Sequence, residues 1–172
     1  RLNKADSANT LRGLEGAAAN RYFTALKIII DPHWQFPGRR RQPPTDPLNV
    51  LLSYGYGVLF STLHTLIVRQ GLHPELGTLH AANGRHPALV SDLMEEFRSP
   101  IVDTAALSFL KQSEPSDFVW DSDEDYPCQM RDTTRERYLQ HLQNRMRTGV
   151  IHPRTGLRTD HQRLLQMQVA HY

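Results

Sequence analysis

The stretch that decides the fold is DPLNVLLSYGYGVLFSTLHTLIVRQG, residues 46–71. An aspartate directly before a proline is a typical helix start, because the Asp side chain caps free N–H groups and proline suits the first turn. A glycine at position 71 indicates where the helix ends. Between Pro47 and Gln70 only Arg69 is charged. The segment therefore predicts a long central helix that is buried on most sides.

A helix of this length is also long enough to cross a lipid bilayer. However, polar side chains recur along it, and such groups are unfavourable in lipid. They are Asn49, Ser53, Ser61, Thr62, His64 and Thr65. We therefore expect a core helix and no association with a membrane.

The composition predicts one folded helical domain over residues 1–172. The chain is 39% hydrophobic and 22% charged, which supplies a core and excludes a disordered chain. Its net charge of +2 permits nucleic acid as a partner without requiring it. The single cysteine, Cys128, excludes an intrachain disulfide and a cysteine-rich zinc site, and we expect a cytoplasmic protein. Because Arg1 leads straight into a helical pattern, we expect the chain to be part of a longer protein.

Helical periodicity extends over most of the remaining sequence. Apolar residues three and four positions apart predict a first helix from about Asp6 to Ile30, and further helices are expected at 87–112, 132–148 and 159–170. Residues 31–47 form a loop rich in proline, and residues 113–130 an acidic loop with room for a short hairpin. Since no strong strand pattern is present, the predicted fold class is all-α.

The helix expected at 87–112 has an apolar face and an acidic face. The acidic face carries Asp92, Glu95, Glu96, Ser99 and Asp103. It is either a solvated face, because acids suit the first turns of a helix, or one side of a metal site. His80 lies 12 residues before Asp92 and 15 before Glu95, so its loop can fold back over the helix. The spacing equally allows a histidine with a structural role.

Glu15 stands on or beside the apolar stripe of the first helix, in LRGLEGAAANRYF (residues 11–23). A carboxylate on a buried face is costly unless it is paired or binds a metal. One explanation is an ion pair with Arg12 or Arg21, and another is a position at the edge of the stripe with access to water. The third is a metal site. Two carboxylates and the imidazole of His80 would make an open site for Mg²⁺ or Mn²⁺.

Four segments in order carry a resemblance to a known family. They are LRGLEGAAANRYF (11–23), FPGRRRQPPTDPLNVLLSYGYGVLFS (36–61), GLHPELGTLH (71–80) and HPALVSDLMEEFRSPIVD (86–103). The chain resembles the C-terminal catalytic helical domain of the CRISPR-associated protein one family, the metal-dependent nuclease and integrase of spacer acquisition. The tail at 132–172 is also similar to the end of that family. The N-terminal β-rich domain of the family is not among these residues.

The resemblance implies a set of site residues. The metal ligands of the family correspond to Glu15 in GLEG, His80 at the end of GLHPELGTLH, and Glu95 in DLMEEF. Asp92 corresponds to a neighbouring acid that supports the site, while Glu96 is not expected to be a direct ligand. One departure is Phe60, where the family often carries a tyrosine; Tyr54 and Tyr56 lie nearby.

The resemblance also implies an activity and partners. It implies a DNA endonuclease and integrase that uses Mg²⁺ or Mn²⁺ to insert spacer DNA into the repeat array. The nucleophile is a DNA 3′-hydroxyl in transesterification, or water in hydrolysis. The implied partners are double-stranded and branched DNA and a small second subunit of the adaptation complex, with a homodimer in the full-length protein.

A cluster of arginines is the expected DNA contact. Arg39, Arg40 and Arg41 lie in the proline-rich loop, and Arg85 and Arg12 flank the ligand motifs. They can bind phosphates, which makes binding salt dependent, or they are ordinary solvated charges. Three other functions remain open: a helical nucleic-acid-binding module, a hydrolase of small phosphates, and a catalytically silent scaffold of the adaptation complex.

Overall fold

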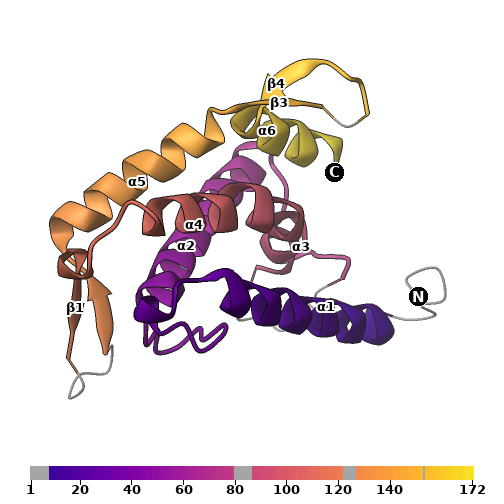
Figure 1. Ribbon diagram of the computed structural model, residues 1–172. Helices are drawn as coiled ribbons and strands as arrows, with labels where there is room; N and C mark the ends of the chain where they lie inside the picture. The colour runs from indigo at the N-terminus through magenta and orange to yellow at the C-terminus, as the bar shows by residue number, and fades with distance from the viewer. Residues whose placement is uncertain (1–7, 80–86, 122–126, 153) are drawn as a thin grey trace.

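The computed structural model describes residues 8–79, 87–121, 127–152 and 154–172. In chain order its elements are α1 (Ala8–Ile29), the 3-10 turn η2 (Pro32–Trp34), α2 (Pro47–Arg69), α3 (Ala88–Phe97), the π-helical segment η3 (Arg98–Asp103), α4 (Thr104–Leu110), the 3-10 turn η4 (Pro115–Asp117), β1 (Phe118–Trp120), β2 (Cys128–Met130), α5 (Asp132–Met146), β3 (Gly149–Ile151), β4 (Arg158–Asp160) and α6 (His161–His171). The predicted helical fold is confirmed, with two short hairpins added (Figure 1).

Helix α2 is the central element, with α3, η3, α4 and α6 packed around it (Figure 1). Its cap is the predicted one, because the Asp46 carboxylate accepts a hydrogen bond of 3.0 Å from the Asn49 N–H. The first turn and a half, residues 47–52, is buried all round, whereas only a stripe is buried beyond it. By length and composition alone α2 could cross a membrane. Its packing in this fold explains its apolar composition without one.

The helix predicted at 87–112 is not continuous. It is interrupted after Phe97 by the π-helical turn η3, which contains Pro100, and resumes as α4. Proline has no N–H, and its ring collides with the carbonyl four residues earlier, so a widened turn accommodates it. The Pro100 carbonyl accepts a hydrogen bond of 2.7 Å from the Arg145 side chain of α5. This wider turn changes which side chains of the following helix, α4, face α2.

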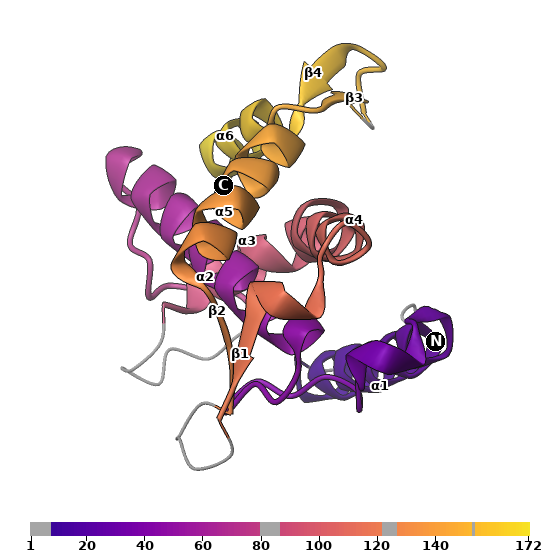
Figure 2. The ribbon, with the colours of Figure 1, turned by 60° about the vertical axis from the view of Figure 1, so that its left-hand side comes forward.

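Helix α1 lies along one side of the molecule, away from α5 and α6 (Figures 1 and 2). Leu26 is its only buried residue among those whose side chains the structure describes. The predicted apolar stripe is therefore mostly not buried here: Tyr22 is half-buried, and Ala18 and Ile29 are exposed. Helix α1 is consequently held at few points, mainly near its C-terminal end.

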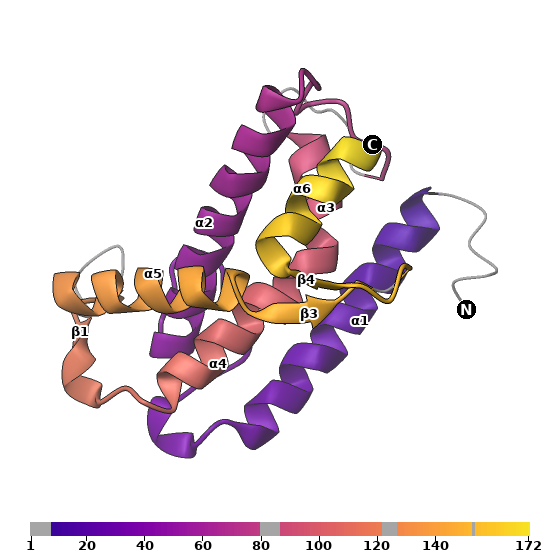
Figure 3. The same ribbon diagram turned by 90° about the horizontal axis from the view of Figure 1, so that it is seen from above.

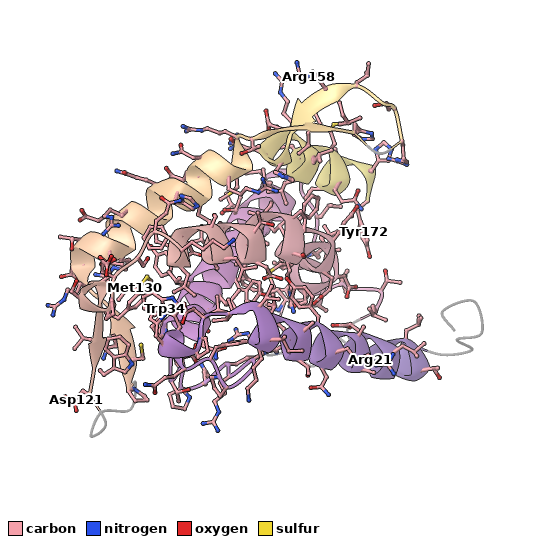
Figure 4. The ribbon with its side chains drawn as sticks, viewed as in Figure 1. Arg21, Trp34, Asp121, Met130, Arg158 and Tyr172 are labelled. Atoms are coloured by element: carbon pink, nitrogen blue, oxygen red, sulfur yellow. The ribbon has the colours of Figure 1, made fainter. Side chains whose placement is uncertain are left out.

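Two hairpins complete the fold. The hairpin predicted within residues 113–130 is present, and β1 pairs antiparallel with β2. Trp34, just after α1, packs edge-on against Phe118 of β1 at 5.8 Å between ring centroids (Figure 4). The β3–β4 hairpin between α5 and α6 was not predicted, and β4 includes Thr159, which the sequence placed in the last helix. From above, this second hairpin extends beside α6 (Figure 3).

The core fills the space between α2 and the helices that cover it. Leu59 and Leu63 of α2, Tyr138 and Leu142 of α5, and Leu165 of α6 are all fully buried in one cluster. This core fixes α2, η3 and α5 relative to one another, and α3 extends from it on one side. The position of α3 relative to α2 is therefore set by the core, while that of α1 depends on separate contacts.

Candidate active site

A groove of about 900 Å³ runs between α1, the arginine loop, α2 and the α3–η3 turn. Glu15 of α1 and Glu95 of α3 both line it, and so do Arg39 and Arg41. The structure thus brings together two of the three predicted metal ligands and two of the predicted DNA-contacting arginines. Helices distant in the sequence line this groove together, because α1 runs alongside α4 and α3 (Figures 1 and 3).

Glu15 stands half-buried on the groove side of α1. Its helical neighbours there are small, because Gly16, Ala18 and Ala19 line the same groove. None of the ion pairs between described residues involves Glu15. The position at the edge of the apolar stripe is the one observed, and small neighbours leave room for a ligand beside the carboxylate.

Glu95 faces the same groove from α3. Its Oε1 atom lies 2.8 Å from the guanidinium of Arg98, one turn later, and both side chains are about three-quarters buried. The next residue, Glu96, is exposed and lines a different pocket with His152 and Arg154. The two adjacent acids therefore lie on different surfaces, and only Glu95 lines the groove together with Glu15.

Asp92 holds the segment that leads to His80. Its Oδ2 atom accepts hydrogen bonds from the backbone N–H groups of Thr78 (2.5 Å) and Leu79 (2.9 Å). Gly77 permits this contact, because a Cβ there would lie 2.7 Å from the backbone carbon of Ala88. His80 and Arg85 lie outside the described residues. Asp92 thus accepts two backbone hydrogen bonds from the two residues before position 80, and its supporting role in a metal site stays a prediction.

The C-terminal residue, Tyr172, also contacts the segment that contains Thr78. The hydroxyls of Thr78 and Tyr172, just beyond α6, lie 2.7 Å apart (Figure 4 labels Tyr172). Asp92 and Tyr172 thus contact Thr78 from α3 and from the end of the chain. The backbone before His80 is therefore anchored to two elements.

The arginine loop is held by a buried side chain of α2. Asn49, which is 0% exposed, donates to the Gly38 carbonyl at 2.8 Å and accepts from the Arg40 N–H at 2.8 Å. The Arg39 guanidinium donates to Asn49 Oδ1 at 2.9 Å and to Ser53 Oγ at 3.2 Å, and burial lowers its pKa. Arg39 is thus fixed against α2, whereas Arg40 and Arg41 are exposed.

A third acidic residue, Asp103, also lines the groove. Asp103 is 3% exposed and accepts a hydrogen bond of 2.5 Å from the Tyr56 hydroxyl. Tyr22 of α1 lines the same groove as Ser99 and Asp103. Burial raises the pKa of Asp103, and the two tyrosine hydroxyls and nearby guanidinium groups act against that rise.

Tyr56 also connects the arginines of the groove. The guanidinium carbons of Arg39 and Arg98 each lie 5.4 Å from its ring centroid, within the range of cation–π contacts. Burial raises the pKa of Tyr56 well above its ordinary value, so its hydroxyl stays a proton donor. The aromatic ring and the hydroxyl of one residue thus bind three charged groups.

The residues of the groove fit a hard divalent cation in part. Carboxylate oxygens are preferred ligands of Mg²⁺ and Mn²⁺, and Glu15 and Glu95 supply them from two helices. Within the described residues no group of three His, Cys, Asp or Glu side chains is arranged to hold a metal. The donor chemistry agrees with the predicted set, of which the third member, His80, is outside the described residues.

Tyr22, Tyr56, Arg98 and Asp103 also line the groove, and they were not predicted as site residues. The sequence spacing could have pointed to two of them, Tyr22 and Arg98. Tyr22 lies seven residues after Glu15, on the same helix face, and Arg98 follows Glu95 by three residues. Asp103 was placed on the acidic face of this segment but not named as a site residue, and its position beside α2 depends on the π-helical turn.

The chain is similar in sequence and in fold to known proteins. A family model described as CRISPR associated protein Cas1 matches residues 1–144. The CRISPR-associated endonuclease Cas1 1 of Thermus thermophilus is 40% identical over 155 residues, which cover 89% of this chain and 48% of that protein.

Two solved structures are similar over nearly the whole chain. A Cas1 protein from Thermotoga maritima superposes with a TM-score of 0.84 at 26% identity, covering 98% of this chain and 52% of that one. A partial Cas6-RT-Cas1–Cas2 complex contains a chain with a TM-score of 0.84 at 29% identity, covering 98% and 50%. The chain spans about half the length of the relatives that it matches. It belongs to the CRISPR-associated Cas1 family and has the fold of the helical half of those proteins.

Proposed function

We propose that this chain is the metal-dependent catalytic part of a Cas1 DNA endonuclease and integrase. The observation that carries the proposal is the groove that Glu15 and Glu95 line from two helices, with Arg39 and Arg41 at its wall. Relatives that match the chain are named Cas1 endonucleases, which supports a nuclease. In this proposal Glu15, Glu95 and His80 hold Mg²⁺ or Mn²⁺.

The proposal assigns a role to Glu15, Glu95, Arg98 and Asp92. A bound divalent ion would polarise the scissile phosphate and offset its developing negative charge. Glu15 and Glu95 supply the carboxylate oxygens, and Arg98 holds Glu95 against the groove wall through their ion pair. One of the two oxygens of the Glu95 carboxylate is the one that contacts Arg98. Asp92 holds the backbone of Thr78 and Leu79, the two residues that precede His80 in the sequence.

The substrate in this proposal is DNA, in double-stranded and branched form. Exposed Arg41 at the groove, with Arg40 beside it, would bind backbone phosphates and position the strand without reading its sequence. When the nucleophile is the 3′-hydroxyl of the incoming spacer, a new phosphorus–oxygen bond forms and the bond to the displaced strand breaks. With water as the nucleophile, the same site hydrolyses the strand.

The partners follow from the relatives. A similar chain occurs in a structure named as a complex of Cas1 with Cas2. We extend that partnership to the full-length form of this protein, with a small second subunit and a Cas1 homodimer. Because the chain spans about half of its relatives, these partners need not bind to the residues described here.

The test is cleavage of branched and linear DNA with Mn²⁺, with Mg²⁺ and with a chelator. Glu15→Ala, His80→Ala and Glu95→Ala are compared with Glu96→Gln, the matched control that changes the adjacent acid on another surface. Thermal unfolding of each variant establishes that it is folded. Metal-dependent cleavage that is lost in the three alanine variants and kept in Glu96→Gln supports the proposal.

Two results contradict it. Cleavage that continues in the chelator, or in folded Glu15→Ala and Glu95→Ala, shows that the groove carboxylates are not the metal site. If the wild-type chain neither cleaves DNA nor gains thermal stability from Mn²⁺, it is a silent helical DNA-binding or scaffold module. Retarded DNA migration without cleavage distinguishes binding from scaffolding.

A further inference from the structure

Two guanidinium groups of the groove lie against one aromatic ring. The guanidinium carbons of Arg39, from the arginine loop, and of Arg98, from η3, are each 5.4 Å from the centroid of the Tyr56 ring. All three residues line the groove. Each guanidinium is attracted to the ring, but two positive charges held against one ring also repel each other. Such an arrangement is typical of a site where both charges bind the same anion.

Arg39 has no carboxylate in direct contact among the described residues. Its hydrogen bonds go to neutral acceptors, the Arg40 carbonyl at 2.5 Å, Asn49 Oδ1 at 2.9 Å and Ser53 Oγ at 3.2 Å. None of the ion pairs between described residues involves this half-buried arginine. Partial burial of an unpaired charge is costly. A guanidinium also has more N–H groups than these bonds use, so donors remain for an anion in the groove.

Arg98 is only partly satisfied by its ion pair with Glu95. One of its terminal nitrogens lies 2.8 Å from Glu95 Oε1, and its side chain is still 24% exposed. Its Nε atom is shielded from solvent and has no hydrogen-bond partner in the part of the chain that the structure describes. An N–H group without an acceptor costs free energy. The guanidinium of Arg98 therefore has donors left for oxygen atoms that enter the groove.

Tyr56 connects the two arginines because its own position is fixed. Its hydroxyl donates to Asp103 Oδ1 at 2.5 Å, and Asp103 is almost completely buried. Arg39 is held to α2 through Asn49, and Arg98 is held to α3 through Glu95. The arginine loop, α2 and the start of η3 thus meet at the ring of Tyr56.

We infer that Arg39 and Arg98 form one phosphate-binding subsite in the groove, with Tyr56 as the positioning residue that holds them together. The ligand is a backbone phosphate of the DNA strand, since planar guanidinium donors match phosphate oxygens. The inference rests on the proposed function for DNA as the substrate, and it adds Arg98 and Tyr56 to the residues that place it. Such a contact fixes the register of the strand without reading its sequence.

The test couples single phosphates of the DNA to single arginines. A branched DNA carries one neutral methylphosphonate, which is moved in turn along the strands on both sides of the branch, and its affinity is measured in a chelator. Wild type, Arg39→Gln and Arg98→Gln are compared with Arg135→Gln. Like Arg98, Arg135 pairs with an acid three residues earlier, but it lies on α5 and does not line the groove. Thermal unfolding establishes that each variant is folded.

We expect one methylphosphonate position to weaken wild-type binding about 10-fold, as for the loss of a hydrogen bond to a charged group. At that position the penalty should disappear in Arg98→Gln, because the partner of the phosphate is already gone. In Arg39→Gln it should disappear at the same phosphate or at the next one. Arg135→Gln should keep the wild-type penalty at every position.

Two variants of Tyr56 separate its ring from its hydroxyl. Tyr56→Leu removes the ring that both guanidinium groups contact, so the penalties that depend on Arg39 and on Arg98 should disappear together. Tyr56→Phe keeps the ring and loses the bond to Asp103. It should be less stable than the wild type but retain a penalty at the same position. Destabilisation alone therefore does not produce the predicted pattern.

Two kinds of result overturn the inference. No coupled position in the wild type, or positions for Arg39 and Arg98 more than one nucleotide apart, would exclude a shared subsite. A penalty that persists in folded Tyr56→Leu would exclude Tyr56 as its positioning residue. Because binding is measured without metal, such a failure leaves metal-dependent cleavage to be decided by the carboxylate variants. Coupled binding without any cleavage would keep the subsite and contradict the proposed activity, so the two failures are distinguishable.

Discussion

Tyr56 donates a hydrogen bond of 2.5 Å to Asp103, a carboxylate that is 3% exposed. The contact joins α2 to the π-helical turn at the floor of the groove. Because burial raises the pKa of Asp103, the carboxylate depends on its hydrogen-bond donors to remain charged in this position. The bond therefore bears on both the stability of the fold and the shape of the site.

Replacing Tyr56 by Phe should destabilise the protein. It removes a donor from a buried carboxylate, which costs about 1–3 kcal/mol in the free energy of unfolding. The control is Tyr138→Phe: the Tyr138 hydroxyl is buried and has no hydrogen-bond partner in the described part of the chain, so its loss should be neutral or stabilising. Urea unfolding of both variants measures the difference, and equal effects would contradict the role given to the bond.

Gly55 is expected to tolerate no side chain. A Cβ there would lie 2.6 Å from Val102 Cγ1 and 2.9 Å from the Tyr138 hydroxyl, where α2 approaches η3 and α5. Gly55→Ala should therefore cost about 1–3 kcal/mol through overpacking. Gly57→Ala, two residues on, meets nothing within 4 Å and should stabilise α2 by about 1 kcal/mol. Thermal unfolding of the pair gives opposite signs, and a shared sign would show that α2 is packed differently.

The helices that could be predicted from the sequence are those marked by caps, prolines and apolar periodicity within the helix itself. The cap at Asp46, the proline that follows it and the apolar run placed α2 to within a residue, and the ends of α1 and α5 were predicted to within about two. The break at η3 was missed because a proline can end, bend or widen a helix, and only packing decides which. The β3–β4 hairpin was missed because strands of three residues show no alternation.

The candidate site was predicted unevenly for a similar reason. Glu15 and Glu95 could be named from motifs, and the structure places both in one groove. The sequence placed Asp103 on the acidic face and Tyr56 near Phe60, but the contact between the two could not be predicted, since it arises from the widened turn and from the approach of α2. The arginine loop was predicted as a uniform cluster, but Asn49 fixes Arg39 inside it while its neighbours stay exposed.

Arg41 should contribute to DNA binding through its charge. It is exposed and lines the groove, so Arg41→Ala should weaken DNA binding of every sequence alike. The slope of log K against log salt should become shallower by about 1, the value for one lost phosphate contact. Arg158→Ala, in the β3–β4 hairpin (Figure 4), is the control and should leave the slope unchanged. Equal slopes for wild type and both variants would exclude Arg41 as a phosphate contact.

Stability should fall as the pH drops below about 6.5, the ordinary pKa of histidine. Burial, and then the charge of Arg145, lower the pKa of His161 in the folded protein, whereas Asp160 acts the other way. The folded state therefore binds fewer protons than the unfolded state, and stability is lost between pH 6.5 and the lower folded pKa.

Unfolding midpoints between pH 7.5 and 5 test this loss. His161→Leu should flatten the decline, because it removes a buried titrating group, whereas His73→Gln, at an exposed position, should not. An undiminished decline in His161→Leu would assign the pH dependence to other groups. His141, whose pKa burial also lowers, is then the next to replace.

The most direct test of the central claim is the number of Mn²⁺ ions bound per chain, measured by electron paramagnetic resonance. The claim is that Glu15 and Glu95 hold one metal ion from opposite sides of one groove. The account predicts one tight site in the wild type and in Glu96→Gln, and its loss in folded Glu15→Gln and in folded Glu95→Gln. Wild-type binding retained in either groove variant would contradict it.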